Sequence, residues 1–230
     1  MPRDVGVVLV AAGRSTRLGG QTPKQFRPIA GVPMVLRALR PFASHPEVAQ
    51  VVLVLPSEHA EHPPEFLRSL GSGLTLVAGG AARADSVAAG LAALSPTCAT
   101  VLVHDAARPF VERGVIDAVI AHARAGEGAV AAVRVSDTVK EAAAADPSRV
   151  VRTVPRDGLW RAQTPQGFPR AVLERAHREA GPERSAATDD AALVERLGVP
   201  VRLVPDSPRN LKVTTSEDLA LAEVLAREGA

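Results

Sequence analysis

Strand-like and helix-like runs alternate along most of the chain, and this alternation limits the fold more than any other feature. The first run, residues 5–10, is continuously apolar and rich in β-branched side chains, as expected of a strand that is covered on both faces. Amphipathic stretches with a helical period separate the later runs. Such alternation is typical of an α/β sheet with helical crossovers. The sequence therefore predicts a Rossmann-like three-layer αβα sandwich with a mostly parallel sheet.

The same pattern predicts where the elements lie. Strands are expected at residues 5–10, 51–55, 74–77, 100–103, 129–135, 161–164, 201–204 and 211–213. Helices are expected at residues 33–43, 84–94, 114–125, 169–180 and 189–197, with a last helix from Ser216. Asp85 or Ser86 is expected to cap the second of these helices, and Ser216 the last.

Residues 136–154 interrupt the alternation. Short alternating segments lie on both sides of the turn-forming sequence ADPS, a pattern that predicts a β-hairpin. A hairpin inserted into a parallel fold has exposed edges, and a second subunit is a common cover for such edges. We therefore expect one domain over residues 1–230, with this hairpin protruding as the dimerisation arm of a homodimer.

Composition argues against several other classes of protein. The hydrophobic fraction of 46% and the charged fraction of 23% are those of a globular chain. No apolar run approaches the roughly 18 residues of a membrane span, so a cytoplasmic protein with no membrane partner is expected. With a net charge of +2 and an aromatic content of 3%, the chain lacks the basic, aromatic-rich stripe of a nucleic-acid-binding protein. The single cysteine, Cys98, excludes an internal disulfide and a cysteine-rich metal site.

The turn after the first predicted strand carries the strongest functional signal. Its residues 11–13, AAG, have side chains small enough for a ligand to approach the backbone, and the cations Arg17 and Lys24 follow. Neither common phosphate-loop sequence is present, because Ser15 stands where the dinucleotide-binding motif needs glycine. Several cations beside such a backbone cradle suit a polyphosphate.

Other polar residues follow later predicted strands, where ligands of open α/β sheets bind. Gly79 and Gly80 lead into a helix N-terminus, which favours anions. Asp105 follows a buried strand, and a carboxylate there suits a hard cation or a ribose hydroxyl. Lys212 is one of only three lysines among 27 cationic side chains. Because the other cations are arginines, a lysine here indicates a position that requires a compact charge. His104 is expected to be structural, because no second histidine lies at metal-ligand spacing.

A series of motifs along the chain is similar to those of one enzyme family. In order they are AAGRSTRL, PKQF, GGAARADSV, LVHDAARPF, DTVK, RDGLW with AQTPQGF, ATDDA and NLKVTTSEDLALAE. Their order and spacing make the chain resemble the cytidylyltransferase branch of the nucleotidyltransferases. Within that branch it resembles the 2-C-methyl-D-erythritol 4-phosphate cytidylyltransferase family of the non-mevalonate isoprenoid pathway. The resemblance extends from about Val5 to the last helix.

The resemblance implies a reaction, in which CTP and 2-C-methyl-D-erythritol 4-phosphate give 4-diphosphocytidyl-2-C-methyl-D-erythritol and pyrophosphate. It implies Mg²⁺ or another divalent cation, and a homodimer whose arm helps to close the partner's substrate site. The residues implied to stabilise the transition state or to position the substrate phosphate are Arg17, Lys24, Arg156 and Lys212. Those implied to bind the nucleotide are Ala11, Ala12, Gly13, Ser15, Gly79, Gly80, Arg83, Ser86, Asp105 and Ala106, with Asp105 also the expected metal ligand. Those implied to line the methylerythritol side are Arg108, Thr138, Thr164 and Thr188.

The chain departs from the family pattern at two positions. Ser15 stands where a second glycine is usual, and Ala81 where an acidic residue is common. Backbone contacts at both positions would preserve CTP binding, whereas a required carboxylate at the position of Ala81 would weaken it.

Three alternatives stay open at this point. A cytidylyltransferase for another polyol phosphate, such as ribitol 5-phosphate, fits the same motifs. An NAD(P)-binding Rossmann oxidoreductase requires an acidic residue at the end of the second strand, but that strand ends VLVLPSEH and Glu58 lies too far along. A non-catalytic nucleotide-sensing module is disfavoured by Arg17, Lys24 and Lys212 occurring together.

Overall fold

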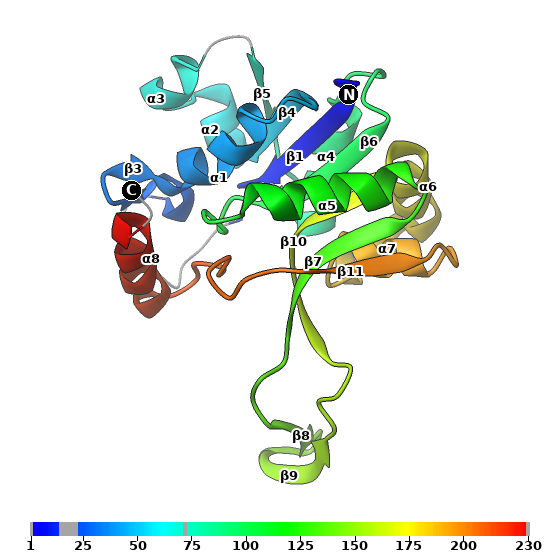
Figure 1. Cartoon of the computed structure of the whole chain (residues 1–230). Coiled ribbons are helices and arrows are strands. Elements are labelled where there is room, and N and C mark those ends of the chain that lie inside the picture. Colours follow the sequence, from blue (N-terminus) through cyan, green and yellow to red (C-terminus); the bar gives the residue numbers. More distant parts are fainter. Residues whose placement is uncertain (1, 14–22, 71–72, 229–230) are drawn as a thin grey trace.

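A computed structural model of the chain describes residues 2–13, 23–70 and 73–228 (Figure 1). A seven-stranded sheet lies at its centre, in the order β11-β7-β10-β6-β1-β4-β5. The strands are β1 (Val5–Val10), β4 (Val48–Leu55), β5 (Leu74–Ala78), β6 (Thr100–Asp105), β7 (Gly128–Arg134), β10 (Trp160–Pro169) and β11 (Val201–Pro205). Every pairing is parallel except those of β10, which is antiparallel to both β6 and β7. The expected mostly parallel sheet is confirmed.

Helices cover both faces of this sheet and give the predicted three layers. The helices are α1 (Met34–Ala43), α2 (Ser57–Glu61), α3 (Glu65–Arg68), α4 (Arg83–Ala92), α5 (Arg113–Arg124), α6 (Arg170–Ala180), α7 (Asp190–Glu195) and α8 (Ser216–Glu228), with the 3₁₀ helices η1 (Lys24–Phe26) and η3 (Gly181–Ala186). Val7 and Leu9 of β1 belong to the buried cluster that includes α1 and α5, and Val8 belongs to the cluster that includes α4, α6 and α7. Successive strand side chains point to opposite faces, so the continuous apolar run of β1 supplies both layers.

The C-terminal helix packs beside a small hairpin rather than on the sheet (Figure 1). The hairpin pairs β2 (Pro28–Ile29) with β3 (Val32–Pro33), and Ile29 and Met34 share a buried cluster with Ala222 of α8. Val213 belongs to the same cluster. This packing holds the segment before α8, which carries Lys212, against the body of the protein.

The arm leaves the sheet between β7 and β10 and extends well beyond it (Figure 1). Its strands β8 (Val139–Ala143) and β9 (Asp146–Val154) pair antiparallel, which confirms the predicted hairpin. The turn is formed by Ala144 and Ala145, so only the first residue of ADPS lies in it, because Asp146 already pairs with Ala143. The carboxylate of Asp146 instead accepts hydrogen bonds from the backbone N–H and the hydroxyl of Ser148.

The structure corrects both predicted helix caps. α4 begins after Ala82, and Asp85 lies in its first turn, where its carboxylate accepts the Ala82 N–H at 3.2 Å. At α8, the Thr215 hydroxyl accepts the Asp218 N–H, and the Asp218 carboxylate accepts the Thr215 N–H. The capping side chain is therefore that of Thr215 and not of Ser216. In each case an acid in the first turn completes the end of the helix.

The predicted strand at residues 211–213 is not formed. The Val213 N–H donates to the Ala107 carbonyl at 2.8 Å, but the segment pairs with no strand of the sheet in the described part of the chain. β10 is longer than predicted and continues to Pro169. The short elements β2, β3, α2, α3, η1 and η3 were not predicted, since elements of two to six residues are too short to show a period. No helix in the described ranges combines the length and the apolar character that a bilayer span requires.

A substitution at Gly90 of α4 can test how closely this helix approaches β1. An added Cβ at Gly90 would lie 2.4 Å from Cγ1 of Val8 and 2.9 Å from Cγ2 of Val54. Alanine stabilises a helix interior by about 1 kcal/mol relative to glycine, but overpacking of a core costs about 1–3 kcal/mol. We expect Gly90→Ala to lower the free energy of unfolding by about 1 kcal/mol, as measured by urea denaturation.

The matched control is Gly114→Ala in α5, where an added Cβ meets nothing within 4 Å. That variant should be as stable as the parent or slightly more stable. A stabilised Gly90→Ala protein would contradict the close contact between α4 and the sheet.

Candidate active site

Asp105, the last residue of β6, is the centre of a cluster of charged side chains. Arg83, the first residue of α4, donates its Nε–H to Oδ1 of Asp105 at 3.1 Å. The Nζ atom of Lys212 lies 2.7 Å from Oδ2. The Asp105 side chain is 10% exposed and that of Lys212 is 43% exposed. Three segments far apart in the sequence therefore meet at one buried carboxylate.

The cations keep this carboxylate ionised. Burial alone would raise the pKa of Asp105, but the charges of Arg83, Lys212 and Arg108 hold that pKa well below the usual range of a carboxyl group. Burial would likewise lower the pKa of Arg83, and the carboxylates of Asp105 and Asp190 raise it instead. The cluster is therefore a set of fixed charges at neutral pH.

Buried hydrogen bonds hold the backbone of Asp105 in place. Its N–H donates to Oγ1 of Thr164 at 3.1 Å, and this hydroxyl lies 2.9 Å from Nδ1 of His104. Nε2 of His104 donates to the Arg108 carbonyl at 2.9 Å. Since a carbonyl only accepts, Nε2 carries the imidazole proton and Nδ1 accepts the Thr164 hydroxyl proton. His104 is thus fully hydrogen-bonded within the fold, as the sequence predicts.

Asn210 is completely buried and joins the segment before Lys212 to β10. Its Nδ2 donates to the Thr164 carbonyl at 2.8 Å and to Asp206 at 2.6 Å. Its backbone carbonyl accepts from Arg108 at 2.7 Å and from Gln163 at 3.0 Å. Asn210 therefore links the segment before Lys212 to both Arg108 and Thr164, two of the predicted substrate-side residues.

The two predicted nucleotide loops, after β1 and β5, touch each other. A Cβ added at Gly79 would lie 2.4 Å from Cβ of Ala12 and 2.7 Å from Oγ of Ser86. Larger side chains would not fit at this junction, so the small residues there are a packing requirement.

Much of the backbone at this junction already serves the fold. The N–H groups of Ala11 and Gly79 donate to carbonyls of β4 at 2.8 and 2.7 Å, and that of Ala106 donates to the Val10 carbonyl at 3.0 Å. The Gly80 N–H donates to Oγ of Ser86 at 3.2 Å. Those N–H groups are therefore not available to a ligand, although the predicted loops do lie together.

Four of the remaining predicted site residues lie in other segments of the fold. Lys24 is the first residue of η1, and Thr188 directly precedes Asp189, the N-cap of α7. Thr138 belongs to the arm, and Arg156 follows it directly and donates to the Ser136 carbonyl.

Ser15 and Arg17 lie outside the described residues, and so does most of the loop that follows Gly13. Gly13 itself is described, and it is exposed at the end of the β1 turn.

Asp190, which was not among the predicted site residues, lies behind the cluster. Its Oδ2 is 2.7 Å from NH1 of Arg83, and its Oδ1 is 2.9 Å from Nε2 of His177. The motif ATDDA contains Asp190, but an acid in the first turn of a helix is ordinarily explained by the helix dipole. Asn210 was also missed, because nothing in the sequence marks an asparagine as a buried connection between segments.

The chemistry of Asp105 fits a divalent cation. A carboxylate offers about four lone-pair directions, and Arg83 and Lys212 each contact one of its oxygens. Mg²⁺ is commonly held by one or two carboxylates, with substrate phosphates and water completing its shell. One carboxylate at the end of a strand is therefore sufficient for a cation that arrives with a nucleotide.

A second group of metal-ligand types, His45, Glu47 and Asp117, has ligand atoms within 4.8 Å of one another. Nε2 of His45 donates to Oδ1 of Asp117 at 2.8 Å, and Glu47 forms an ion pair with Arg124. These contacts account for the group without a cation.

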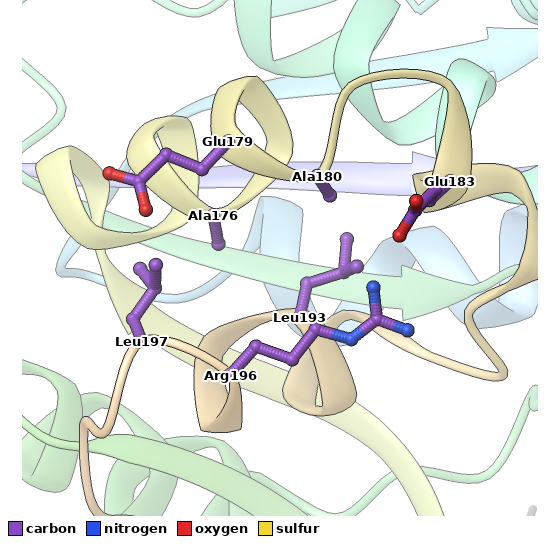
Figure 2. A pocket seen from close by; sticks show the side chains of 7 residues that line it. All are labelled: Ala176, Glu179, Ala180, Glu183, Leu193, Arg196 and Leu197. Carbon is purple, nitrogen blue, oxygen red and sulfur yellow. The ribbon is translucent and has the colours of Figure 1, made fainter.

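A pocket of about 230 Å³ lies between α6 and α7 (Figure 2). Leu193 and Leu197 line it from α7 and the residues after it, and Glu179, Glu183 and Arg196 place charges around it (Figure 2). None of the predicted site residues lines this pocket, so the Asp105 cluster stays the candidate active site.

Comparison with known proteins gives one consistent result. Residues 5–228 match the model of the family described as 2-C-methyl-D-erythritol 4-phosphate cytidylyltransferase. A protein of that name from Salinibacter ruber is 46% identical over 223 residues, covering 96% of this chain and 92% of the relative. One from Pelotomaculum thermopropionicum is 44% identical over 230 residues, covering 98% and 96%. The crystal structure of 2-C-methyl-D-erythritol 4-phosphate cytidylyltransferase from Thermus thermophilus matches with a TM-score of 0.79 at 38% identity, covering 96% of this chain and 98% of that one.

The buried His104 predicts how stability depends on pH. Burial lowers the pKa of His104 from 6.5 to about 4. Between these values the unfolded chain binds a proton at this residue that the folded protein does not bind, so stability falls as the pH falls. We expect His104 to contribute a loss of up to about 3 kcal/mol between pH 6.5 and pH 4, and no pH dependence above pH 7.

Urea denaturation at pH 7, 5.5 and 4.5 measures this loss. His104→Gln is the comparison, because it removes the titrating group, and its stability should fall less steeply over the same range. Equal slopes for the two proteins would mean that His104 is not the group responsible.

Proposed function

The chain belongs to the 2-C-methyl-D-erythritol 4-phosphate cytidylyltransferase family, and we propose that it catalyses the reaction that the family's name describes. It transfers the cytidylyl group of CTP to 2-C-methyl-D-erythritol 4-phosphate, which yields 4-diphosphocytidyl-2-C-methyl-D-erythritol and pyrophosphate for isoprenoid precursor synthesis. The observation that carries this proposal is the family match over residues 5–228. The cations gathered at Asp105 support it, because both reactants are phosphorylated.

The chemistry requires charge neutralisation more than proton transfer. A phosphate monoester, with a second pKa near 6, is mostly dianionic at neutral pH, so it attacks the α-phosphate of CTP without a general base. The obstacle is the approach of one anion to another, and the charge that builds on the leaving pyrophosphate. Fixed cations lower that barrier by stabilising the transition state.

The cationic side chains divide into two roles. Lys212 and Arg156 position the attacking phosphate, and Arg17 and Lys24 stabilise the transition state at the α-phosphate. For Lys212, the support is its exposure of 43% together with its ion pair to Asp105 at the end of β6. An incoming phosphate meets an accessible ammonium group there, at the edge of the sheet where ligands of α/β folds bind.

The nucleotide lies over the junction of the β1 and β5 loops, next to Asp105. Gly79, Ala12 and Ser86 give this junction its close packing, and Asp105 faces the ribose or a divalent cation. Bound Mg²⁺ would supply further neutralisation of the phosphate charge, and Asp105 is the residue that would hold it.

The arm completes the site of a second protomer, so the active form is a homodimer. The support is the projection of the arm away from the sheet (Figure 1) and the exposure of Val150 and Val151, at 55% and 56%. Exposed apolar side chains on a two-stranded hairpin favour a covering partner. Thr138 and Arg156 then reach the partner's methylerythritol side. The cytoplasmic location remains a prediction from the sequence.

Pyrophosphate release tests the proposed activity directly. CTP is compared with ATP, GTP and UTP, and 2-C-methyl-D-erythritol 4-phosphate with ribitol 5-phosphate and other polyol phosphates, each with Mg²⁺. We expect release only with CTP and fastest release with the methylerythritol substrate. Faster release with ribitol 5-phosphate would reassign the substrate, and no release with any pair would overturn the function.

Lys24→Ala and Arg17→Ala test the transition-state role. Each variant should lower kcat by about a hundredfold or more, since one lost contact to the developing charge costs on the order of 3 kcal/mol of barrier. Arg175→Ala, which removes an exposed cation of α6 paired with Glu179, is the control and should keep the parent kcat. Near-parent turnover in either test variant would remove that residue from the role.

Arg156→Ala tests the proposed substrate contact directly after the arm. The loss of this guanidinium should raise KM for 2-C-methyl-D-erythritol 4-phosphate by about tenfold or more, with a much smaller change in KM for CTP. Steady-state kinetics with each substrate varied in turn measures both constants. Equal increases in the two constants would argue against a contact with the polyol phosphate.

A further inference from the structure

We propose that Asp190 is a positioning residue of the active site, which holds one edge of the Arg83 guanidinium so that the other edge faces Asp105. The proposal rests on the proposed function in one respect, since it takes Asp105 to face the nucleotide. Asp190 itself lies behind the cluster, at the start of α7, and is not expected to touch either substrate.

The Arg83 side chain bridges two carboxylates. Its Nε is 3.1 Å from Asp105 and its NH1 is 2.7 Å from Asp190. The Asp190 side chain is 1% exposed, and that of Arg83 is 27% exposed. A planar guanidinium bound on two edges by buried carboxylates has a fixed orientation, which a lysine ammonium group would not reproduce.

His177 of α6 fixes Asp190 in turn. Its Nε2 is 2.9 Å from the carboxylate oxygen that Arg83 does not contact, so both oxygens of Asp190 are occupied. The other ring nitrogen, Nδ1, is buried and has no hydrogen-bond partner among the described residues. The hydrogen bond to Asp190 is therefore the polar contact that accounts for a histidine at this buried position.

Charge balance makes Asp190 relevant to the nucleotide site. Asp105 and Asp190 carry two negative charges, against the two positive charges of Arg83 and Lys212. Removing the charge of Asp190 leaves the partly buried guanidinium of Arg83 with Asp105 as its one carboxylate partner in the cluster. Arg83 then binds Asp105 more closely, and Asp105 becomes less available to a ribose hydroxyl or a cation.

Asp190→Asn tests this proposal, because the amide keeps the shape of the side chain and an oxygen for His177 while losing the charge. We expect its Kd for CTP, measured by calorimetry with and without Mg²⁺, to rise by about tenfold, as when a supporting partner of a binding group is lost. The fall in kcat at saturating CTP should be smaller. Glu179→Gln removes the same charge from an exposed site on α6 and should leave the Kd unchanged.

A double-mutant cycle separates positioning from simple stabilisation. A lysine at position 83 does not bridge both carboxylates, so adding Asp190→Asn to Arg83→Lys should change the Kd for CTP by less than about twofold. Fully additive effects of the two substitutions would overturn the proposal. A lowered melting temperature for Asp190→Asn with an unchanged Kd would also overturn it, since the role would then be structural alone.

His177→Ala provides a second variant in case Asp190→Asn does not fold. It frees one oxygen of Asp190 without removing the charge, and we expect a smaller increase in the Kd for CTP in the same direction. An unchanged Kd in the folded His177→Ala protein would contradict the proposal. Parent protein that binds CTP but releases no pyrophosphate would overturn the proposed function alone, whereas parent protein that does not bind CTP would overturn both.

Discussion

The ion pairs of Asp105 with Arg83 and Lys212 join the segments on which the site depends. A carboxylate buried at the end of a central strand is unfavourable unless cations and hydrogen bonds compensate for its lost hydration. Arg83 brings the start of α4 to Asp105, and Lys212 brings the irregular segment before α8. Asn210 fixes that segment to β10, and Thr164 fixes the Asp105 backbone. The arrangement of charge is thus built into the packing of the core.

This arrangement suits a reaction between two anions. Fixed charges need no rearrangement when the attacking phosphate approaches, which is the main advantage of a preorganised site over water. Lys212 is both paired and partly exposed, so it can exchange its contact with Asp105 for one with a phosphate. Asp190 and His177 extend the fixed network from Arg83 at the start of α4 to α7 and α6, which belong to the same helical layer. Under the proposed function the residues expected to contact the polyol phosphate differ, because Thr138 lies on an arm that extends away from the sheet and Arg156 follows that arm directly (Figure 1).

The elements that the sequence predicted well are those with a sustained apolar pattern. β1, α1 and α5 each present a continuous or periodic apolar face, and their bounds were close to those observed. The arm was recognisable because its alternation differs from that of the buried strands. Caps and short elements were predicted poorly, since Asp85 and Thr215 act through hydrogen bonds that depend on where the helix begins.

The sequence by itself determined the layered fold, the arm, the family and the choice of Asp105 and Lys212 as candidate site residues, because these follow from local periodicity and from motifs of neighbouring residues. Only the tertiary structure decided which charges meet. Asp190 and Asn210 act across 107 and 46 positions of the chain, and no local pattern encodes such a separation. Burial then gives each contact its strength, because a carboxylate or an amide without water must find its partners within the fold.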